Sequence, residues 1–257
     1  MKFTHAIVKT PCETFAQGQT AVDLGAPELP LVLTQHAAYC AALKRCGLAL
    51  TELPADAHYP DSTFVEDTAV LLPNCAVLTH PGHASRQGEV EAIRPAIAAF
   101  YERIVRIEAP GTLDGGDICE AGSHFFIGVS HRTNHAGAQQ LAAYLQAEGC
   151  TSELVDVRQV PGILHLKSGI SYLGKDNLLL IEPLFDHPAF AAYKRHRVPA
   201  EEAYAANSLR INDHVLVPAG FPQVEKLVES LGYPVIPLEM SEFQKMDGGL
   251  SCLSLRF

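Results

Sequence analysis

One cysteine, one histidine and several carboxylates stand in turn-like segments of this 257-residue chain. Cys252 follows an Asp-Gly-Gly run in "DGGLSC", and His165 lies in the alternating stretch "LHLKSG". Together with carboxylates, these types suit nucleophilic attack on a positively charged carbon, because a thiolate can attack and a histidine can move protons. The carboxylates come from two further segments, "PDSTFVED" and "TLDGGD": Asp61, Glu66, Asp67, Asp114 and Asp117.

A guanidinium group is the cation that this combination fits best. It is planar and has paired N–H donors, which carboxylates bind in bidentate fashion. Resonance makes its central carbon a poor electrophile, so the nucleophile must be strong and held in line. A thiolate meets this requirement, and a cation bound beside it lowers its pKa. A histidine could then protonate the departing amine and later deprotonate water.

Each feature taken singly has a simpler explanation. Asp-Gly is common in hairpin turns, a lone histidine is commonly a hydrogen-bonded core residue, and a lone cysteine commonly packs as a small hydrophobe. The carboxylate cluster of residues 60–67 could be a solvated loop. The combination, rather than any single feature, therefore predicts a site.

The elements that must position these residues repeat along the chain. Each unit begins with a short apolar strand, continues through a turn and an amphipathic helix, and ends in a second strand. Five such units imply an α/β protein with quasi-symmetry about a shared central axis, whereas an ordinary doubly wound α/β sheet is the alternative. The first strands are expected at residues 6–11, 76–82, 125–132, 178–183 and 215–220, and the second strands that the sequence marks at 48–53, 103–109, 153–157 and 234–239.

Three helices and the chain end show the pattern in detail. Apolar stripes predict helices over 134–149 and 222–232, each closed by a glycine. A third helix, over 88–104, contains Pro95 and is therefore expected to be kinked or to start later than its periodicity suggests. Residues 250–257 alternate as a strand does, which would hold Cys252 in a sheet rather than in a frayed end.

The composition limits the kinds of molecule that the protein is expected to bind. The formal charge is -10 with a pI near 5.6, and no long basic run occurs, so nucleic acid and anionic membranes are not expected partners and a small cationic ligand is. No stretch approaches the roughly 18 apolar residues that cross a bilayer, and the first residues do not form a signal segment. We expect a cytoplasmic protein. Its seven cysteines are odd in number and lack CxxC spacing, so neither a disulfide framework nor a zinc ribbon is expected.

The motifs, taken in order, resemble those of dimethylarginine dimethylaminohydrolases. This family belongs to the guanidino-group-modifying superfamily and has a five-bladed α/β propeller fold. The resemblance runs from about Lys9 to the C-terminus and implies a single domain over 1–257 that requires no metal or cofactor. It also implies a homodimer. The motifs that carry it are "PDSTFVED", "PGHASRQGE", "TLDGGD", "HRTN", "LHLKSG" and "DGGLSCLS".

The resemblance implies three catalytic residues. Cys252 would attack the guanidinium carbon and form a covalent thiouronium adduct. His165 would act as general acid and then as general base. Asp114 would orient His165 while facing the substrate.

The resemblance also implies contacts to the substrate. Acidic residues of the first motif would hold the two cationic groups, with Asp67 and Glu66 on the guanidinium and Asp61 on the α-amino group. Two arginines would hold the α-carboxylate, a phenylalanine would line the alkyl stem, and two residues would offer backbone carbonyls. The full set is Gln19, Asp61, Phe64, Glu66, Asp67, Arg86, Arg132 and Met246.

One departure from the family pattern bears on the substrate. Bacterial relatives commonly have Gly-Leu-Thr where this chain has Gly18-Gln19-Thr20, so an apolar side chain near the pocket mouth becomes an amide. The expected reaction is hydrolysis of Nω-methylated L-arginine to L-citrulline and methylamine or dimethylamine. A related guanidino enzyme, such as an arginine deiminase or an amidinotransferase, is one alternative, and a non-catalytic binding protein on the same fold is another. The presence of both Cys252 and His165 weighs against the latter.

Overall fold

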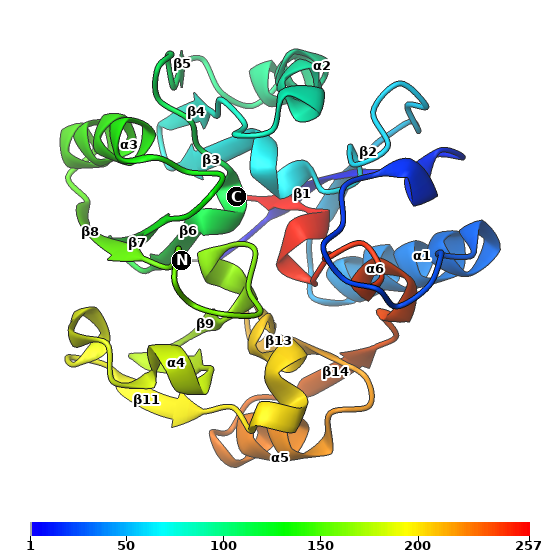
Figure 1. Cartoon of the computed structure of the whole chain (residues 1–257), viewed down its shortest axis with the longest axis vertical. Helices are drawn as coiled ribbons and strands as arrows, with labels where there is room; N and C mark the ends of the chain where they lie inside the picture. Colours follow the sequence, from blue (N-terminus) through cyan, green and yellow to red (C-terminus); the bar gives the residue numbers. More distant parts are fainter. Residues whose placement is uncertain (1) are drawn as a thin grey trace.

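Five separate three-stranded sheets surround a common centre in the computed structural model, which describes residues 2–257 (Figure 1). In each sheet, the end strand that pairs antiparallel with the middle strand lies innermost. Such inner strands contact those of neighbouring sheets. From the inside outward the sheets are β15 (Leu255–Arg256), β1 (His5–Lys9) and β2 (Ala49–Leu53); β3 (Ala69–Leu72), β4 (Cys75–Leu78) and β5 (Ile104–Arg106); β6 (Ile118–Ala121), β7 (His124–Val129) and β8 (Thr151–Asp156); β9 (Ile170–Gly174), β10 (Asn177–Leu180) and β11 (Lys194–Arg197); β12 (Leu209–Ile211), β13 (His214–Pro218) and β14 (Val235–Leu238).

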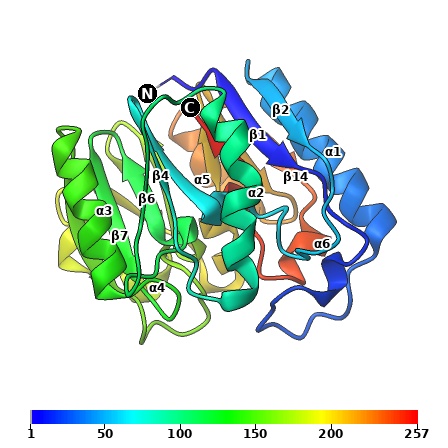
Figure 2. The ribbon, with the colours of Figure 1, turned by 90° about the horizontal axis from the view of Figure 1, so that it is seen from above.

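All five sheets share one plan. The middle strand pairs antiparallel with the inner strand and parallel with the outer one. A parallel pair needs a crossover, and a helix supplies it on the outside of the ring (Figure 2). These helices are α1 (Leu29–Arg45), α2 (Gln87–Ala98), α3 (His135–Ala147), α4 (Glu182–Phe185) and α5 (Pro222–Ser230), and α6 (Ser241–Gln244) precedes the C-terminal segment. The predicted five-bladed α/β propeller is confirmed, and the doubly wound alternative is wrong.

The inner strands were not expected from the sequence as a separate set. Four of them follow directly from turns within the chain, but the inner strand of the first sheet is β15, at the far end of the chain. Ala6 pairs with Arg256 and Ile7 with Leu255. The C-terminus therefore closes the ring and lies near its centre (Figure 1).

Two local predictions need correction. The expected strand over 250–257 is shorter, because the strand comprises Leu255–Arg256 and Cys252 lies instead in a 3-10 turn, Ser251–Leu253. The structure does not follow the alternation, because Leu250, Ser251, Leu253, Ser254 and Leu255 are all buried. Helix α2 begins at Gln87 and contains Pro95, so a later start is wrong, and it ends at Ala98 rather than near residue 104.

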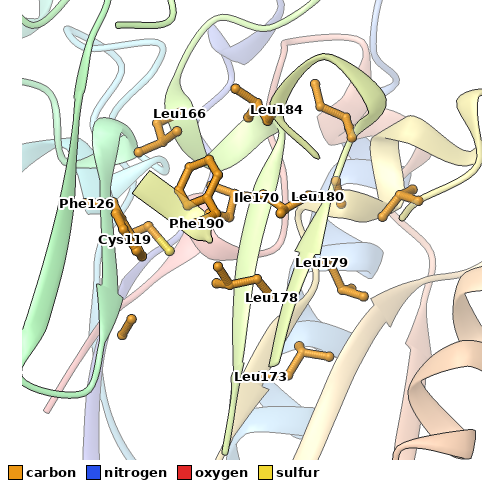
Figure 3. Close-up of a cluster of buried hydrophobic side chains, with 14 of the residues drawn as sticks. Cys119, Phe126, Leu166, Ile170, Leu173, Leu178, Leu179, Leu180, Leu184 and Phe190 are labelled. Carbon is orange, nitrogen blue, oxygen red and sulfur yellow. The ribbon is translucent and has the colours of Figure 1, made fainter. Parts of the chain in front are cut away.

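Apolar side chains fill the spaces between neighbouring sheets rather than the centre of the ring. In the largest such cluster, Phe126 of β7 meets Phe190 edge to face at 4.9 Å between ring centroids, beside leucines of β10 (Figure 3). This packing leaves the axis of the ring to polar residues. No helix within residues 2–257 has both the length and the apolar character to cross a membrane.

Candidate active site

A short 3-10 turn precedes the inner strand of every sheet, so the five turns meet around the axis. The predicted catalytic residues belong to these turns or lie next to them: Asp114 precedes η4, His165 precedes η5, and η8 contains Cys252. Glu66 and Asp67 lie in η2. Contacts link η2 to η8 and η4, and η5 to η4 and η7. The quasi-symmetry thus brings segments from across the chain to one place. The turns are η2 (Val65–Thr68), η4 (Gly115–Asp117), η5 (Leu166–Ser168), η7 (Ala200–Ala206) and η8 (Ser251–Leu253).

The two Asp-Gly-Gly runs allow these turns to approach closely. A Cβ on Gly116 would lie 2.8 Å from His165 Cδ2 and 2.9 Å from Asp67 Oδ1, and one on Gly249 would lie 2.6 Å from the Asn207 side chain. Neither contact distance is tolerable for a real methyl group. The glycines are therefore needed for space at the centre of the ring, which the turn interpretation of "DGG" does not explain.

Cys252 faces a cavity that also contains His165. The backbone N–H of Gly249 points at its Sγ at 3.4 Å. Burial raises the pKa of the Cys252 thiol to about 12, and the negative charges of Glu66 and Asp67 act in the same direction. A cation bound between these carboxylates and Cys252 would oppose that shift, so the thiol is placed to ionise when a cationic substrate is present.

Asp117, rather than Asp114, holds the His165 ring. His165 Nδ1 lies 3.3 Å from Asp117 Oδ2, while Nε2 lies 3.9 Å from Asp114 Oδ2 and 4.0 Å from Asp67 Oδ1. Burial acts to lower the pKa of His165, but the surrounding carboxylates outweigh it and raise this pKa to about 9. The imidazole is therefore protonated at neutral pH. The predicted orienting role of Asp114 is corrected accordingly.

Asp117 is itself fixed by its neighbours. Its Oδ2 accepts hydrogen bonds from the hydroxyls of Ser130 (2.7 Å) and Thr133 (2.6 Å), and its Oδ1 accepts one from the backbone N–H of Leu166 (2.9 Å). A fully bonded carboxylate of this kind sets both the position and the tautomer of the histidine that it contacts.

Asp114 is buried, and only one of its two carboxylate oxygens accepts a hydrogen bond from the described residues. Its Oδ1 accepts the backbone N–H of Gly82 at 2.8 Å, whereas its Oδ2 has no hydrogen-bond partner among the described residues. Burial raises its pKa, and the neighbouring charge of Asp67 adds to the increase. Oδ2 lies 4.0 Å from Arg132 Nη1 as well as close to His165.

Most of the predicted substrate-binding residues line the same cavity as Cys252 and His165. The cavity measures about 30 Å³, room for very few water molecules. Asp114 and Glu66 do not line it. The predicted substrate contacts that do are Gln19, Asp61, Phe64, Asp67, Arg86, Arg132 and Met246.

The loop that carries Gln19 closes one side of this cavity. Its backbone N–H groups bond to two carboxylates, that of Gln19 to Asp61 (3.0 Å) and that of Ala21 to Asp247 (2.6 Å). Gln19 lines the cavity and its backbone N–H holds Asp61 in place, while the contact of its carbonyl with a substrate stays a prediction. A cavity of about 30 Å³ is smaller than an arginine, so binding one here requires the surrounding side chains or this loop to shift.

Arg86 is more heavily engaged than the resemblance implied. It is buried, it pairs with Asp67, and it donates to Glu89 at 2.8 Å and to the Phe64 carbonyl at 3.0 Å. It therefore holds Asp67 in place. Arg132, whose side chain is 15% exposed, is the freer cation for an α-carboxylate.

Glu66 belongs to a polar network on the axis of the ring and does not line the cavity beside Asp67. Its carboxylate meets Lys167 at 2.5 Å, Ser251 Oγ at 2.7 Å and Arg256 at 2.9 Å. Asn207 extends the network by donating to the Lys167 carbonyl at 2.9 Å. Instead of facing the cavity, Glu66 joins its own turn η2 to η5 and η8, and Asn207 connects this network to the end of η7.

Among residues 2–257, one group of three side chains is arranged so that it could hold a metal ion. These are Asp67, Asp114 and His165, whose ligand atoms lie within 4.8 Å of one another. Asp67 and His165 line the cavity, and Asp114 lies directly behind His165.

Comparison with known proteins agrees with this geometry. The arginine deiminase family model matches residues 64–198. The N(G),N(G)-dimethylarginine dimethylaminohydrolase of Pseudomonas aeruginosa is 43% identical over 256 residues, which cover 99% of this chain and 100% of that protein. The chain belongs to the dimethylarginine dimethylaminohydrolase family.

Solved structures of that family have the same fold. A cysteine-to-serine variant of the Pseudomonas aeruginosa enzyme, complexed with citrulline, matches with a TM-score of 0.97, at 43% identity and with 100% of both chains covered. A histidine-to-glycine variant of a dimethylarginine dimethylaminohydrolase, as an adduct with S-methyl-L-thiocitrulline, matches with a TM-score of 0.96, at 43% identity, covering 99% of this chain and 100% of that one.

Three residues at the centre of the ring were not predicted from the sequence to belong to the site. Asp117 was visible in "TLDGGD" but could not be told from Asp114 as the partner of His165. Lys167 stands two residues after His165, and Asn207 ends η7 without a motif of its own. Only their long-range contacts reveal them.

Proposed function

We propose that the chain hydrolyses Nω-methylated L-arginines, asymmetric dimethylarginine and monomethylarginine, to L-citrulline and dimethylamine or methylamine. The observation that carries this proposal is the convergence of Cys252, His165 and Asp67 on one cavity in a chain of the dimethylarginine dimethylaminohydrolase family. The reaction converts a guanidinium cation and water into a neutral ureido group and an ammonium cation.

The charged residues around the cavity complement the charged groups of the substrate. Asp67 would pair with the guanidinium and Asp61 with the α-amino group, while Arg132 would hold the α-carboxylate and Phe64 the alkyl stem. Burial acts to raise the pKa of Asp67, but the charges of Arg86 and His165 outweigh it and lower this pKa to about 2. Asp67 therefore carries the negative charge that a guanidinium requires at neutral pH.

In the first half-reaction, the bound cation favours the thiolate of Cys252. The thiolate forms an S–C bond to the guanidinium carbon, and the C–N bond to the methylated nitrogen breaks with its electron pair on nitrogen. Protonated His165 donates its proton to that nitrogen, so the amine leaves neutral and a thiouronium remains. Asp117 stabilises the protonated ring before this transfer.

In the second half-reaction, neutral His165 removes a proton from water, which attacks the thiouronium carbon. The S–C bond then breaks with its electron pair returning to Cys252, the second proton of that water passes to solvent, and neutral citrulline is released. His165 ends protonated, as it began. No further reagent is needed to balance the atoms or the charge.

The test is a citrulline assay with asymmetric dimethylarginine, monomethylarginine and arginine on wild-type protein and two cysteine variants. We expect the methylated substrates to react, and Cys252→Ser to reduce their turnover at least about 10³-fold, because a hydroxyl is a far weaker nucleophile at this carbon. Cys150→Ser is the matched control, since Cys150 is only partly buried and lies outside the cavity.

The outcomes separate the alternatives. Turnover of arginine alone would reassign the substrate to that of an arginine deiminase, the family whose model matches residues 64–198. Full activity of Cys252→Ser would remove Cys252 as nucleophile. Binding without turnover would favour a non-catalytic role.

The proposal also covers the domain organisation, the cellular compartment and the partners of the enzyme. We propose that residues 1–257 act as a single domain, that the protein works in the cytoplasm and forms a homodimer, and that its partner is the small-molecule substrate rather than nucleic acid or membrane. The net charge of -10 supports the preference for a cation over nucleic acid.

A further inference from the structure

A second, larger cavity adjoins the one that would hold the amino acid. It measures about 370 Å³, at the lower end of the range for small-molecule sites. We call it the distal cavity. It shares five residues with the small cavity, and these mark the junction: Leu164, His165, Asp247, Gly248 and Cys252.

The junction fixes which part of a substrate would reach the distal cavity. Asp61 and Arg132, the partners proposed for the α-amino and α-carboxylate groups, line only the small cavity. Cys252 and His165 line both. A substrate whose guanidinium carbon lies at Cys252 therefore directs its Nω nitrogen, which His165 protonates, toward the distal cavity.

The walls of the distal cavity suit alkyl groups. Ile163 and Val198 line it from the segments before β9 and after β11, and Ala203 lines it from η7, while Val22 and Leu24 follow Gln19 in the loop beside it. Charged residues also line it, namely Glu66, Lys167, Glu182 and Asp247. Both loop residues are exposed, Val22 at 39% and Leu24 at 50%. Apolar side chains on the side of the departing nitrogen would favour a methylated amine over ammonia.

We propose that the distal cavity is the subsite for the Nω substituent and the exit for the departing amine, and that it admits alkyl groups longer than methyl. This inference rests on the proposed function and specifies its substrate class as Nω-alkyl arginines. After the C–N bond breaks and His165 gives its proton to nitrogen, the neutral amine leaves through the distal cavity and takes up a proton in solvent.

Two lining variants test the proposal with a series of arginines that carry Nω-methyl, dimethyl, ethyl and propyl groups. Ala203→Phe should fill the distal cavity, and Ile163→Ala should enlarge it. Ala191→Phe is the matched control, because Ala191 is exposed and does not line either cavity. The readouts are kcat/KM from citrulline release and the thermal midpoint of each variant.

We expect the wild type to use the propyl substrate within about tenfold of the monomethyl one, since a pocket with room discriminates weakly against added methylenes. Ala203→Phe should lower kcat/KM for the propyl substrate at least about tenfold more than for the methyl substrate, and Ile163→Ala should shift the ratio the other way. Ala191→Phe should leave the ratio unchanged.

The proposal is overturned if the wild type hydrolyses dimethylarginine but not ethyl- or propylarginine. It is equally overturned if folded Ala203→Phe and Ile163→Ala both keep the wild-type ratio between propyl and methyl substrates. Failure of every arginine derivative, dimethylarginine included, would instead overturn the proposed function on which it rests.

Discussion

His165 is the residue whose surroundings decide whether the proposed chemistry can run at neutral pH. Three carboxylates, those of Asp117, Asp67 and Asp114, lie within 4.0 Å of its ring nitrogens. They hold the proton that the departing amine needs. The same charges oppose ionisation of Cys252, so the site depends on a cationic substrate to reverse that effect.

Replacing Asp117 should therefore change the pH dependence as well as the rate. In Asp117→Asn the ring loses its charged partner, so the pKa of His165 falls and the alkaline limb of kcat moves to lower pH. We expect kcat at neutral pH to drop about 10²-fold or more. Stopped citrulline assays from pH 6 to pH 10 would measure both effects. Asp156→Asn, at an exposed aspartate that pairs with Arg158, is the control, and an unshifted alkaline limb would count against the role of Asp117.

The same group links folding to pH. The pKa of His165 rises from 6.5 in the unfolded chain to about 9 in the folded protein. Its contribution to stability is thus fully present below pH 6.5 and is lost as the pH rises through 9, on the order of 3 kcal/mol at most.

Urea unfolding at several pH values would measure this contribution. The free-energy difference between wild type and His165→Gln should shrink between pH 6 and pH 10. His58→Gln provides the control, because the His58 side chain is 91% exposed. A difference that stays constant over this range would contradict the assignment.

At the scale of elements, the decisive feature is that the last strand closes the ring. β15 supplies the inner strand of the first sheet, and the turn immediately before it holds Cys252. The nucleophile therefore sits on the segment whose pairing completes the fold. The pairing that closes the ring therefore also fixes the position of Cys252.

A cavity in this closure should be costly. Leu255 is 4% exposed and packs with Ile7, Val65 and Leu78 between the first two sheets. Leu255→Ala should lower the free energy of unfolding by about 2–5 kcal/mol, because lost burial adds to the cavity left behind. Leu31→Ala, at a residue 45% exposed on α1, should cost far less. Urea denaturation of the two variants would measure the difference, and equal losses would show that β15 does not close the ring as described.

At the scale of the whole molecule, charge and substrate are complementary. The chain carries a net charge of -10, and a methylarginine carries a net positive charge at neutral pH. Such a field speeds the approach of a cation and is weakened by salt.

We therefore expect kcat/KM for dimethylarginine to fall as salt rises from about 0.01 M to about 1 M, over which the Debye length shrinks from about 30 Å to about 3 Å. The saturated rate kcat should change much less, because a bound substrate is shielded from solvent, and it serves as the internal control. Initial-rate measurements at each salt concentration would separate the two constants. A kcat/KM that does not respond to salt would mean that the net charge plays no part in capture.

The sequence by itself determined the units and the chemical groups. Local patterns predicted the helices over 134–149 and 222–232 closely, because apolar spacing and end signals act over a few residues. The order of the motifs was enough to indicate the family, the propeller and the identities of Cys252 and His165. These features depend on residues that are near one another in the chain.

Only the tertiary structure decided how the groups divide the work. It paired His165 with Asp117 rather than Asp114, engaged Arg86 with Asp67, and placed Glu66 in the axial network. The physical reason is that the contacts of His165 and Glu66 join turns from different sheets, 48 positions apart for His165 and Asp117 and 185 for Glu66 and Ser251. Even the Arg86–Asp67 pair spans 19 positions. Two aspartates three positions apart look alike in sequence, and the packing of five turns around one axis is what distinguishes them.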